Sequence, residues 1–282
     1  MQKHATVVCA AIAVSIPAFA GPILFTSSGA TPASITATRD AFRVALGGGT
    51  VAGANGLFQD PTGARREINW DGVPDAFSAP NNLPANFFNV NSPRGAVFAT
   101  PGSGFQVSAN AGIAPVNFGN IDPSYSSVFQ TFSPQRLFTA LGSNITDVNF
   151  FVPGTTIPGF VSGFGAIFTD VDLTTSTTIQ YFALNNTSLG TFAVPSSPSG
   201  GLSFLGIQFN AGERVGRVRI TSGNAALGAG ILDQNGLSND LAVMDDFLFG
   251  NPQDVPEPAT LLLLGPALLG LGLLKRTGLF RS

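Results

Sequence analysis

The stretch Gly163-Phe164-Gly165-Ala166-Ile167-Phe168-Thr169-Asp170-Val171-Asp172 indicates the fold class of this 282-residue chain. It is a short hydrophobic run that ends in aspartates, and similar short runs follow along most of the chain after residue 104. One of them, Ile179–Val194, carries Asn185-Asn186 at its middle and predicts a β-hairpin. The other stretches with strand character are 105–109, 147–152, 202–209, 215–221 and 241–249.

Many short strands separated by Gly, Pro and Asn predict a mainly β fold, an antiparallel β-sandwich of the jelly-roll type. One N-terminal helix is expected at Pro32–Leu46, since Pro32 follows a threonine cap and Gly47-Gly48-Gly49 ends the helix. Its Arg39 and Arg43 are expected on a solvated face, with a ligand clamp as the alternative. Residues 53–101 are rich in Gly, Pro and Asn and are expected to form long irregular loops.

The N-terminus has the pattern of a signal peptide over residues 1–20. A short region with Lys3 precedes the apolar run Ala5–Ile16, and Ala18-Phe19-Ala20 before Gly21 fits the small-x-small cleavage rule. The alternative is a buried N-terminal helix. We therefore expect residues 21–254 to form a single β-sandwich domain whose N-terminal part is helical and rich in loops.

The C-terminus, residues 255–282, combines three features. Pro256-Glu257-Pro258 is followed by the apolar run 259–274, which is a little shorter than the ~20 residues of a typical membrane helix. Lys275 and Arg276 then form a basic end, which favours the cytoplasmic side of a membrane. Such an order of motif, hydrophobic segment and basic end is typical of a terminal sorting signal with a transmembrane segment.

This tail resembles the PEP-CTERM sorting signal of exported proteins from exopolysaccharide-forming Gram-negative bacteria. The body is similar to the globular part of a recurrent group of such proteins in 66–72, 163–172 and 243–247. The resemblance implies export through the inner membrane, a C-terminal segment that anchors the chain transiently, and cleavage near the motif by an exosortase, a membrane cysteine protease. It also implies a cell-surface or extracellular location, but it does not imply any enzymatic reaction.

Composition excludes several kinds of chemistry. The only histidine and cysteine are His4 and Cys9, and residues 21–254 also contain no lysine. Nucleophilic sites that need His or Cys, Schiff-base lysines and zinc sites with His or Cys ligands are therefore excluded from the body, and no haem or nucleotide is expected. The body has nine arginines and fifteen acidic residues, which gives it a net charge of −6. A negatively charged body does not suit a protein that binds the phosphates of nucleic acid.

Aspartates supply the candidate metal ligands. Asp170 and Asp172 end one predicted strand, Asp245 and Asp246 begin the last one, and oxygen-only shells suit calcium. The alternative is that they cap turns. The loop Asp233–Asp240 lacks the spacing of an EF-hand and is expected to be a solvated turn.

Trp70, the only tryptophan, is a candidate carbohydrate-binding residue together with Asn69 and Asp71. Its flat ring could stack on a sugar while the polar neighbours bond hydroxyl groups, and Tyr125 and Tyr181 could extend that surface. The alternative is a core tryptophan that attaches the long loop to the sheet.

Two functions remain open. The first is a non-enzymatic surface or matrix protein that binds exopolysaccharide. The second is a calcium-dependent polysaccharide hydrolase or lyase, which would need two close carboxyls, one with a raised pKa.

Overall fold

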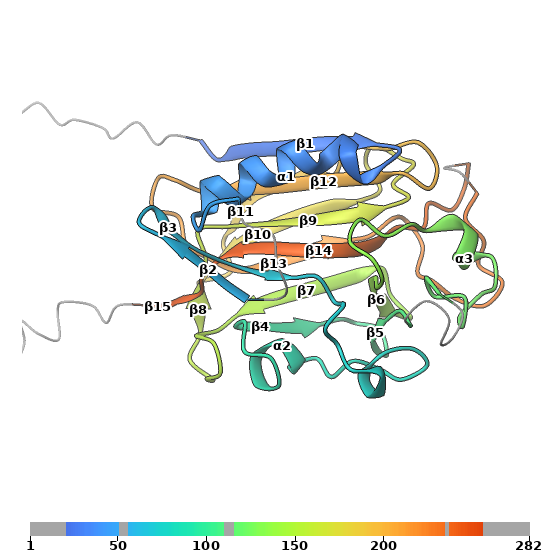
Figure 1. Cartoon of the computed structure of the whole chain (residues 1–282), viewed down its shortest axis with the longest axis horizontal. Coiled ribbons are helices and arrows are strands. Elements are labelled where there is room, and N and C mark those ends of the chain that lie inside the picture. Colours follow the sequence, from blue (N-terminus) through green and yellow to red (C-terminus); the bar gives the residue numbers. More distant parts are fainter. Residues whose placement is uncertain (1–20, 51–55, 110–115, 235–236, 256–282) are drawn as a thin grey trace, which may run out of the picture.

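The computed structural model describes residues 21–50, 56–109, 116–234 and 237–255. Within these ranges the chain is mainly β, with antiparallel strand pairs in two large sheets and few helices. Figure 1 shows helix α1 lying across one face of the larger sheet, while the smaller sheet lies behind that sheet. Among the described residues, no helix has the length and hydrophobicity needed to cross a membrane.

The larger sheet has eight strands in the order β1-β12-β9-β14-β3-β2, and β6 pairs with both β14 and β5. Every residue of the central strands β9 and β14 is buried, because α1 covers one face of the sheet and the second sheet covers the other. The strands are β1 (Ile23–Gly29), β2 (Gly56–Asp60), β3 (Gly63–Ile68), β5 (Gly104–Val107), β6 (Phe138–Leu141), β9 (Gly163–Thr169), β12 (Leu202–Gln208) and β14 (Val243–Gly250).

The smaller sheet has five strands in the order β11-β10-β13-β7-β4. Its β7 alternates strictly between buried and half-buried residues, so one face points into the core and the other points outward. The strands are β4 (Ala96–Ala99), β7 (Ile145–Phe150), β10 (Thr178–Ala183), β11 (Ser188–Ala193) and β13 (Val215–Thr221). A separate pair joins β8 (Gly159–Phe160) to β15 (Gln253–Asp254).

Helix α1 (Pro32–Leu46) lies close to the sheet because two glycines leave room for it. Gly165 of β9 and Gly206 of β12 are directly paired, and both contact the ring of Phe42. A Cβ atom on Gly206 would lie 2.9 Å from that ring. The shorter helices are the 3-10 turn η1 (Asp75–Phe77), α2 (Phe87–Val90) and α3 (Tyr125–Val128).

Most of the predicted elements are present. The helix at Pro32–Leu46 and the hairpin formed by β10 and β11 are confirmed. The expectation that residues 53–101 are irregular is wrong in part, since they contain β2, β3 and β4. These strands are only four to six residues long, and β3 and β4 pair with β14 and β7, which lie far away in sequence. The jelly-roll connectivity stays a prediction.

The expected solvated face of α1 is also a wrong prediction. Arg39 and Arg43 are both buried between the helix and the sheet. Acidic side chains on β3 and β14 lie beneath them, so the two arginines point inward rather than into solvent.

Candidate metal centre and binding surface

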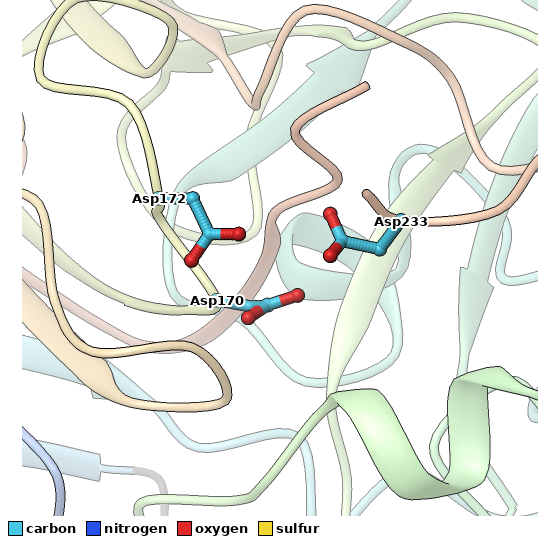
Figure 2. A group of neighbouring side chains, drawn as sticks. All are labelled: Asp170, Asp172 and Asp233. Carbon is cyan, nitrogen blue, oxygen red and sulfur yellow. The ribbon is translucent and has the colours of Figure 1, made fainter. Parts of the chain in front are cut away.

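Three aspartates meet at one end of the larger sheet. Asp170 and Asp172 follow directly after β9, and Asp233 comes from the connection between β13 and β14. Each side chain offers a carboxylate oxygen, and these oxygens lie within 4.8 Å of one another. Figure 2 shows the three carboxyl groups pointing toward a common centre. We call this group the aspartate cluster.

Asp170 is the most deeply buried member of the aspartate cluster. Its residue is fully buried, and its backbone lies in the left-handed region with φ of 65°, where Asp is more tolerated than most residues. The Oδ1 atom accepts a hydrogen bond of 2.6 Å from the Gly200 backbone N–H. The Oδ2 atom is buried and has no hydrogen-bond partner among the described residues, and the same holds for Oδ2 of Asp172.

Burial of these carboxyls makes their charged forms unfavourable. Desolvation raises the pKa of Asp170 to about 7, and the charges of Asp233 and Asp172 add to this effect. Desolvation likewise raises the pKa of Asp172 to about 6, with further contributions from Asp233 and Asp240. A group of carboxyls that repel each other in a poorly solvated place can be stabilised by a bound cation.

Asp240 holds the two loops of the aspartate cluster together without belonging to it. Its carboxylate accepts hydrogen bonds from the backbone N–H groups of Asp172, at 3.1 Å, and Leu173, at 3.2 Å, and from the Ser176 hydroxyl. The Leu241 N–H donates to Oδ1 of Asp233 at 3.1 Å. The prediction of a solvated turn is therefore wrong for Asp240, which is fully buried, and it missed that Asp233 lies beside Asp170.

Asp245 and Asp246 lie elsewhere, on a β-bulge of β14 where two residues face one residue of β9. The Ser133 hydroxyl donates to both carboxylates, and the Phe132 N–H donates to Asp245 at 2.6 Å. Burial raises the pKa of Asp245 well above its ordinary value, and the adjacent Asp246 raises it further. The four predicted calcium ligands therefore lie in two separate places, and only Asp170 and Asp172 belong to the aspartate cluster.

The arginines of α1 form a buried ion-pair network with the larger sheet. Arg43 donates two hydrogen bonds to the Glu67 carboxylate, at 2.8 and 2.6 Å. Arg65 donates to the same carboxylate at 2.6 Å, and Arg39 lies 4.0 Å from Asp246. Each of the five charged groups named here lies against an opposite charge within the protein, which makes this a structural network rather than a ligand clamp.

Trp70 is a core residue, as the alternative interpretation proposed. It is fully buried, it stacks on Phe138 with a centroid distance of 4.1 Å, and its indole N–H donates to the backbone carbonyl of Asp245 at 2.6 Å. Tyr125 and Tyr181 are fully buried too. The prediction that these rings form a sugar-stacking surface is therefore wrong, because all three rings are buried.

The polar neighbours of Trp70 are half-buried. Oδ1 of Asp71 accepts the backbone N–H groups of Gln135, at 2.7 Å, and Arg136, at 3.1 Å. Desolvation raises the pKa of Asp71 to about 6. Asp71 thus connects two segments of the chain, while Asn69 accepts a hydrogen bond from Asp71 N–H through its backbone carbonyl at 2.8 Å.

The outer face of the smaller sheet carries a row of polar side chains that are not among the candidate site residues predicted from the sequence. Arg217 and Arg219 of β13 both donate to Asp147 of β7, at 2.9 and 2.8 Å. The Arg217 guanidinium lies 3.7 Å from the centroid of the Phe182 ring, and Asn149 pairs with Arg217 across the strands. A hollow of about 190 Å³ borders Asn149 and Arg217. We call this row the small-sheet face; the alternation of Arg217 and Arg219 with Val218 and Ile220 is the signal that predicts its exposure.

The terminal signals fall outside the described residues. These are the predicted signal peptide with Ala18 and Ala20, the motif Pro256-Glu257-Pro258, and Lys275 and Arg276. Gly21 is the first described residue and is exposed, and the described chain ends at Val255, also exposed.

Comparison with known proteins identifies one of these segments. Residues 254–276 match the PEP-CTERM protein-sorting motif. This motif indicates an exported protein that is sorted to the cell surface and processed by an exosortase, a membrane protein. No curated protein matches the chain.

One solved structure with a weak similarity is the enzymatically active domain of tailspike protein 4 from bacteriophage CBA120. It is 11% identical, and the match covers 60% of this chain and 20% of that chain with a TM-score of 0.21. The chain thus spans one fifth of the structure that it matches, and a similarity at this level does not define a shared fold.

Proposed function

We propose that this chain is a non-enzymatic surface or matrix protein, and that its β-sandwich body binds exopolysaccharide after export. The PEP-CTERM motif at residues 254–276 is the observation that supports delivery to the cell surface. The absence of His, Cys and Lys from residues 21–254 removes the most common nucleophiles and proton carriers, which favours binding over catalysis.

The small-sheet face is the surface that we assign to the polymer. Arg217 is held in place by Asp147 and by the Phe182 ring, so little side-chain entropy would be lost on binding. Arg219 is 43% exposed and still has N–H groups to offer. A row of arginine and amide donors suits the hydroxyl and carboxylate groups of an acidic polysaccharide.

Binding is tested with the full chain, purified in detergent, on an array of bacterial exopolysaccharides. Wild-type protein should be retained on acidic polymers, and Arg219→Ala should reduce that retention. Arg214→Ala is the matched control, because Arg214 is also an exposed arginine but precedes β13 and packs against Phe160. Equal retention of the two variants would contradict the assignment to the small-sheet face, and no retention of the wild type on any polymer would contradict binding itself.

The aspartate cluster supports a second candidate, the polysaccharide hydrolase or lyase. Such an enzyme needs two close carboxyls, one of them with a raised pKa, and the aspartate cluster contains close carboxyls of which Asp170 has its pKa raised to about 7. However, Asp170 is fully buried, so a polymer could reach only Asp172 and Asp233. Incubation of the same polymers with wild-type protein, followed by a reducing-end assay, tests this candidate. Release of new reducing ends that is lost in Asp172→Asn would favour the enzyme over the binding protein.

A further inference from the structure

The aspartate cluster combines two independent properties of a cation site. The first is geometric, since three carboxylate oxygens from two loops lie within 4.8 Å and point toward one centre (Figure 2). The second is the buried Oδ2 of Asp170, which has no hydrogen-bond partner among the described residues although the residue is fully buried. The Oδ2 atom of Asp172 is buried and unpaired in the same way. A buried carboxylate oxygen is normally hydrogen-bonded, so two unpaired ones within a single group of three carboxylates point to a cation as their partner.

We propose that the aspartate cluster binds one hard divalent cation of the calcium type, held by Asp170, Asp172 and Asp233. The donor atoms are all carboxylate oxygens, which is the ligand chemistry of calcium rather than of zinc or copper. Three carboxylates supply up to six oxygens, and because Asp172 and Asp233 are half-buried, water can complete the shell.

The cation would join two loops that are far apart in sequence. Asp170 and Asp172 belong to the loop after β9, whereas Asp233 belongs to the connection that leads into β14. Asp240 already links these loops through the backbone N–H groups of Asp172 and Leu173. The protein therefore holds the two loops together before a cation binds. The main effect of a bound cation is to remove the repulsion among the three carboxylates.

The proposal does not depend on polysaccharide binding. It concerns the end of the sandwich where β9 ends and β14 begins, and none of its three residues lies on the small-sheet face. Loss of one activity should therefore leave the other unchanged.

The first test counts calcium bound to the full chain. Wild-type protein is treated with a chelator, the chelator is removed, and the protein is dialysed to equilibrium against radioactive calcium in detergent. We expect one calcium ion per chain. An excess of magnesium should compete only weakly with the bound calcium. No bound calcium at millimolar concentration would overturn the proposal.

The second test uses Asp233→Asn, whose amide oxygen can still accept the Leu241 N–H bond. Calcium should raise the melting temperature of the wild type. Loss of a hydrogen-bonding partner outside the metal's own ligands typically weakens metal binding ~10–100-fold, and Asp233→Asn should weaken calcium binding by more than this. Asp254→Asn removes one exposed aspartate at the opposite end and should keep the full calcium response. An equal calcium response of Asp233→Asn and the wild type would overturn the assignment, and Asp172→Asn provides the same comparison if Asp233→Asn does not fold.

Discussion

Asp71 is a single residue whose ionisation should make the stability of the protein depend on pH. Its folded-state pKa is raised to about 6 from the model-compound value of 3.8, mainly by desolvation and in part by the charge of Asp246, while Arg136 opposes the rise. The folded state therefore holds more protons than the unfolded state between these two pH values, so the Asp71 contribution destabilises the protein as pH rises through this window.

The substitution Asp71→Asn should stabilise the protein at pH 7.5, by about 1–2 kcal/mol, since partial exposure reduces the larger effect that such a pKa change would give. Both backbone N–H bonds go to Oδ1, so an asparagine can still accept them. Urea unfolding at several pH values measures the effect. The gain should shrink below pH 6 and disappear near pH 4, and a gain that is constant across this range would contradict the charge argument.

Arg43 is a second residue whose effect follows from burial. Arg43→Ala should lower the free energy of unfolding by about 3–5 kcal/mol, because it leaves the buried Glu67 carboxylate with only part of its partners. Arg219→Ala is the control, since Arg219 also pairs with a carboxylate but is 43% exposed, and its loss should cost about 0–1 kcal/mol. Urea unfolding of both variants measures the two losses of stability. Equal losses would contradict the argument that burial makes the Arg43–Glu67 pair more important than the exposed pair.

Helix α1 packs against the larger sheet through the side chain of Phe42. Gly206→Ala should destabilise the protein by about 1–3 kcal/mol, because the added methyl group meets the Phe42 ring at 2.9 Å and the Phe204 ring at 3.0 Å. Phe42→Leu alone should also destabilise the protein by leaving space in the core. The double variant should be more stable than the sum of the two losses predicts, and a double-mutant cycle by urea unfolding measures this. Strictly additive losses would contradict the close packing of helix and sheet.

Local sequence patterns predicted the elements well where the signal is local. The capping residues of α1 and the turn at Asn185-Asn186 depend on neighbours in the chain, and both elements are found as expected. The strands β2 and β3 were missed because five or six residues with glycine, charge and little alternation carry no local signal. Their order comes from pairing with each other and with β14.

The candidate site was predictable only in part, for a related reason. Asp170 and Asp172 share one strand end, so their proximity follows from the sequence. Asp233 joins them through the antiparallel pairing of β9 with β14, which no local pattern reveals. Asp245 and Asp246 carry the same sequence signal as Asp170 and Asp172, but they lie at a bulge in β14 and accept hydrogen bonds from Ser133 instead. Arg39 and Arg43 were placed outward because their acidic partners lie on other elements.

In the whole molecule, the aspartate cluster and the start of the sorting motif lie at opposite ends of the body. Strand β14 begins beside the end of β9, where the aspartate cluster lies, and ends at Gly250, shortly before β15. The residues that match the sorting motif begin at Asp254, the last residue of β15. In Figure 1, β15 accordingly lies at the end of the body opposite the loops around α3. The aspartate cluster therefore lies at the end of the body away from the first residues of the sorting motif.

Replacement of Pro256, Glu257 and Pro258 together by alanine should leave an uncut precursor that stays in the membrane. The reason is that these three residues lie within residues 254–276, the match to the sorting motif that indicates processing by an exosortase. Cell fractionation and the mass of the recovered protein measure the outcome. Gln253→Ala, an exposed residue just before the match, should mature like the wild type. If the triple variant also matures and reaches the surface, the motif does not direct sorting in this chain, and another part of the tail must carry that signal.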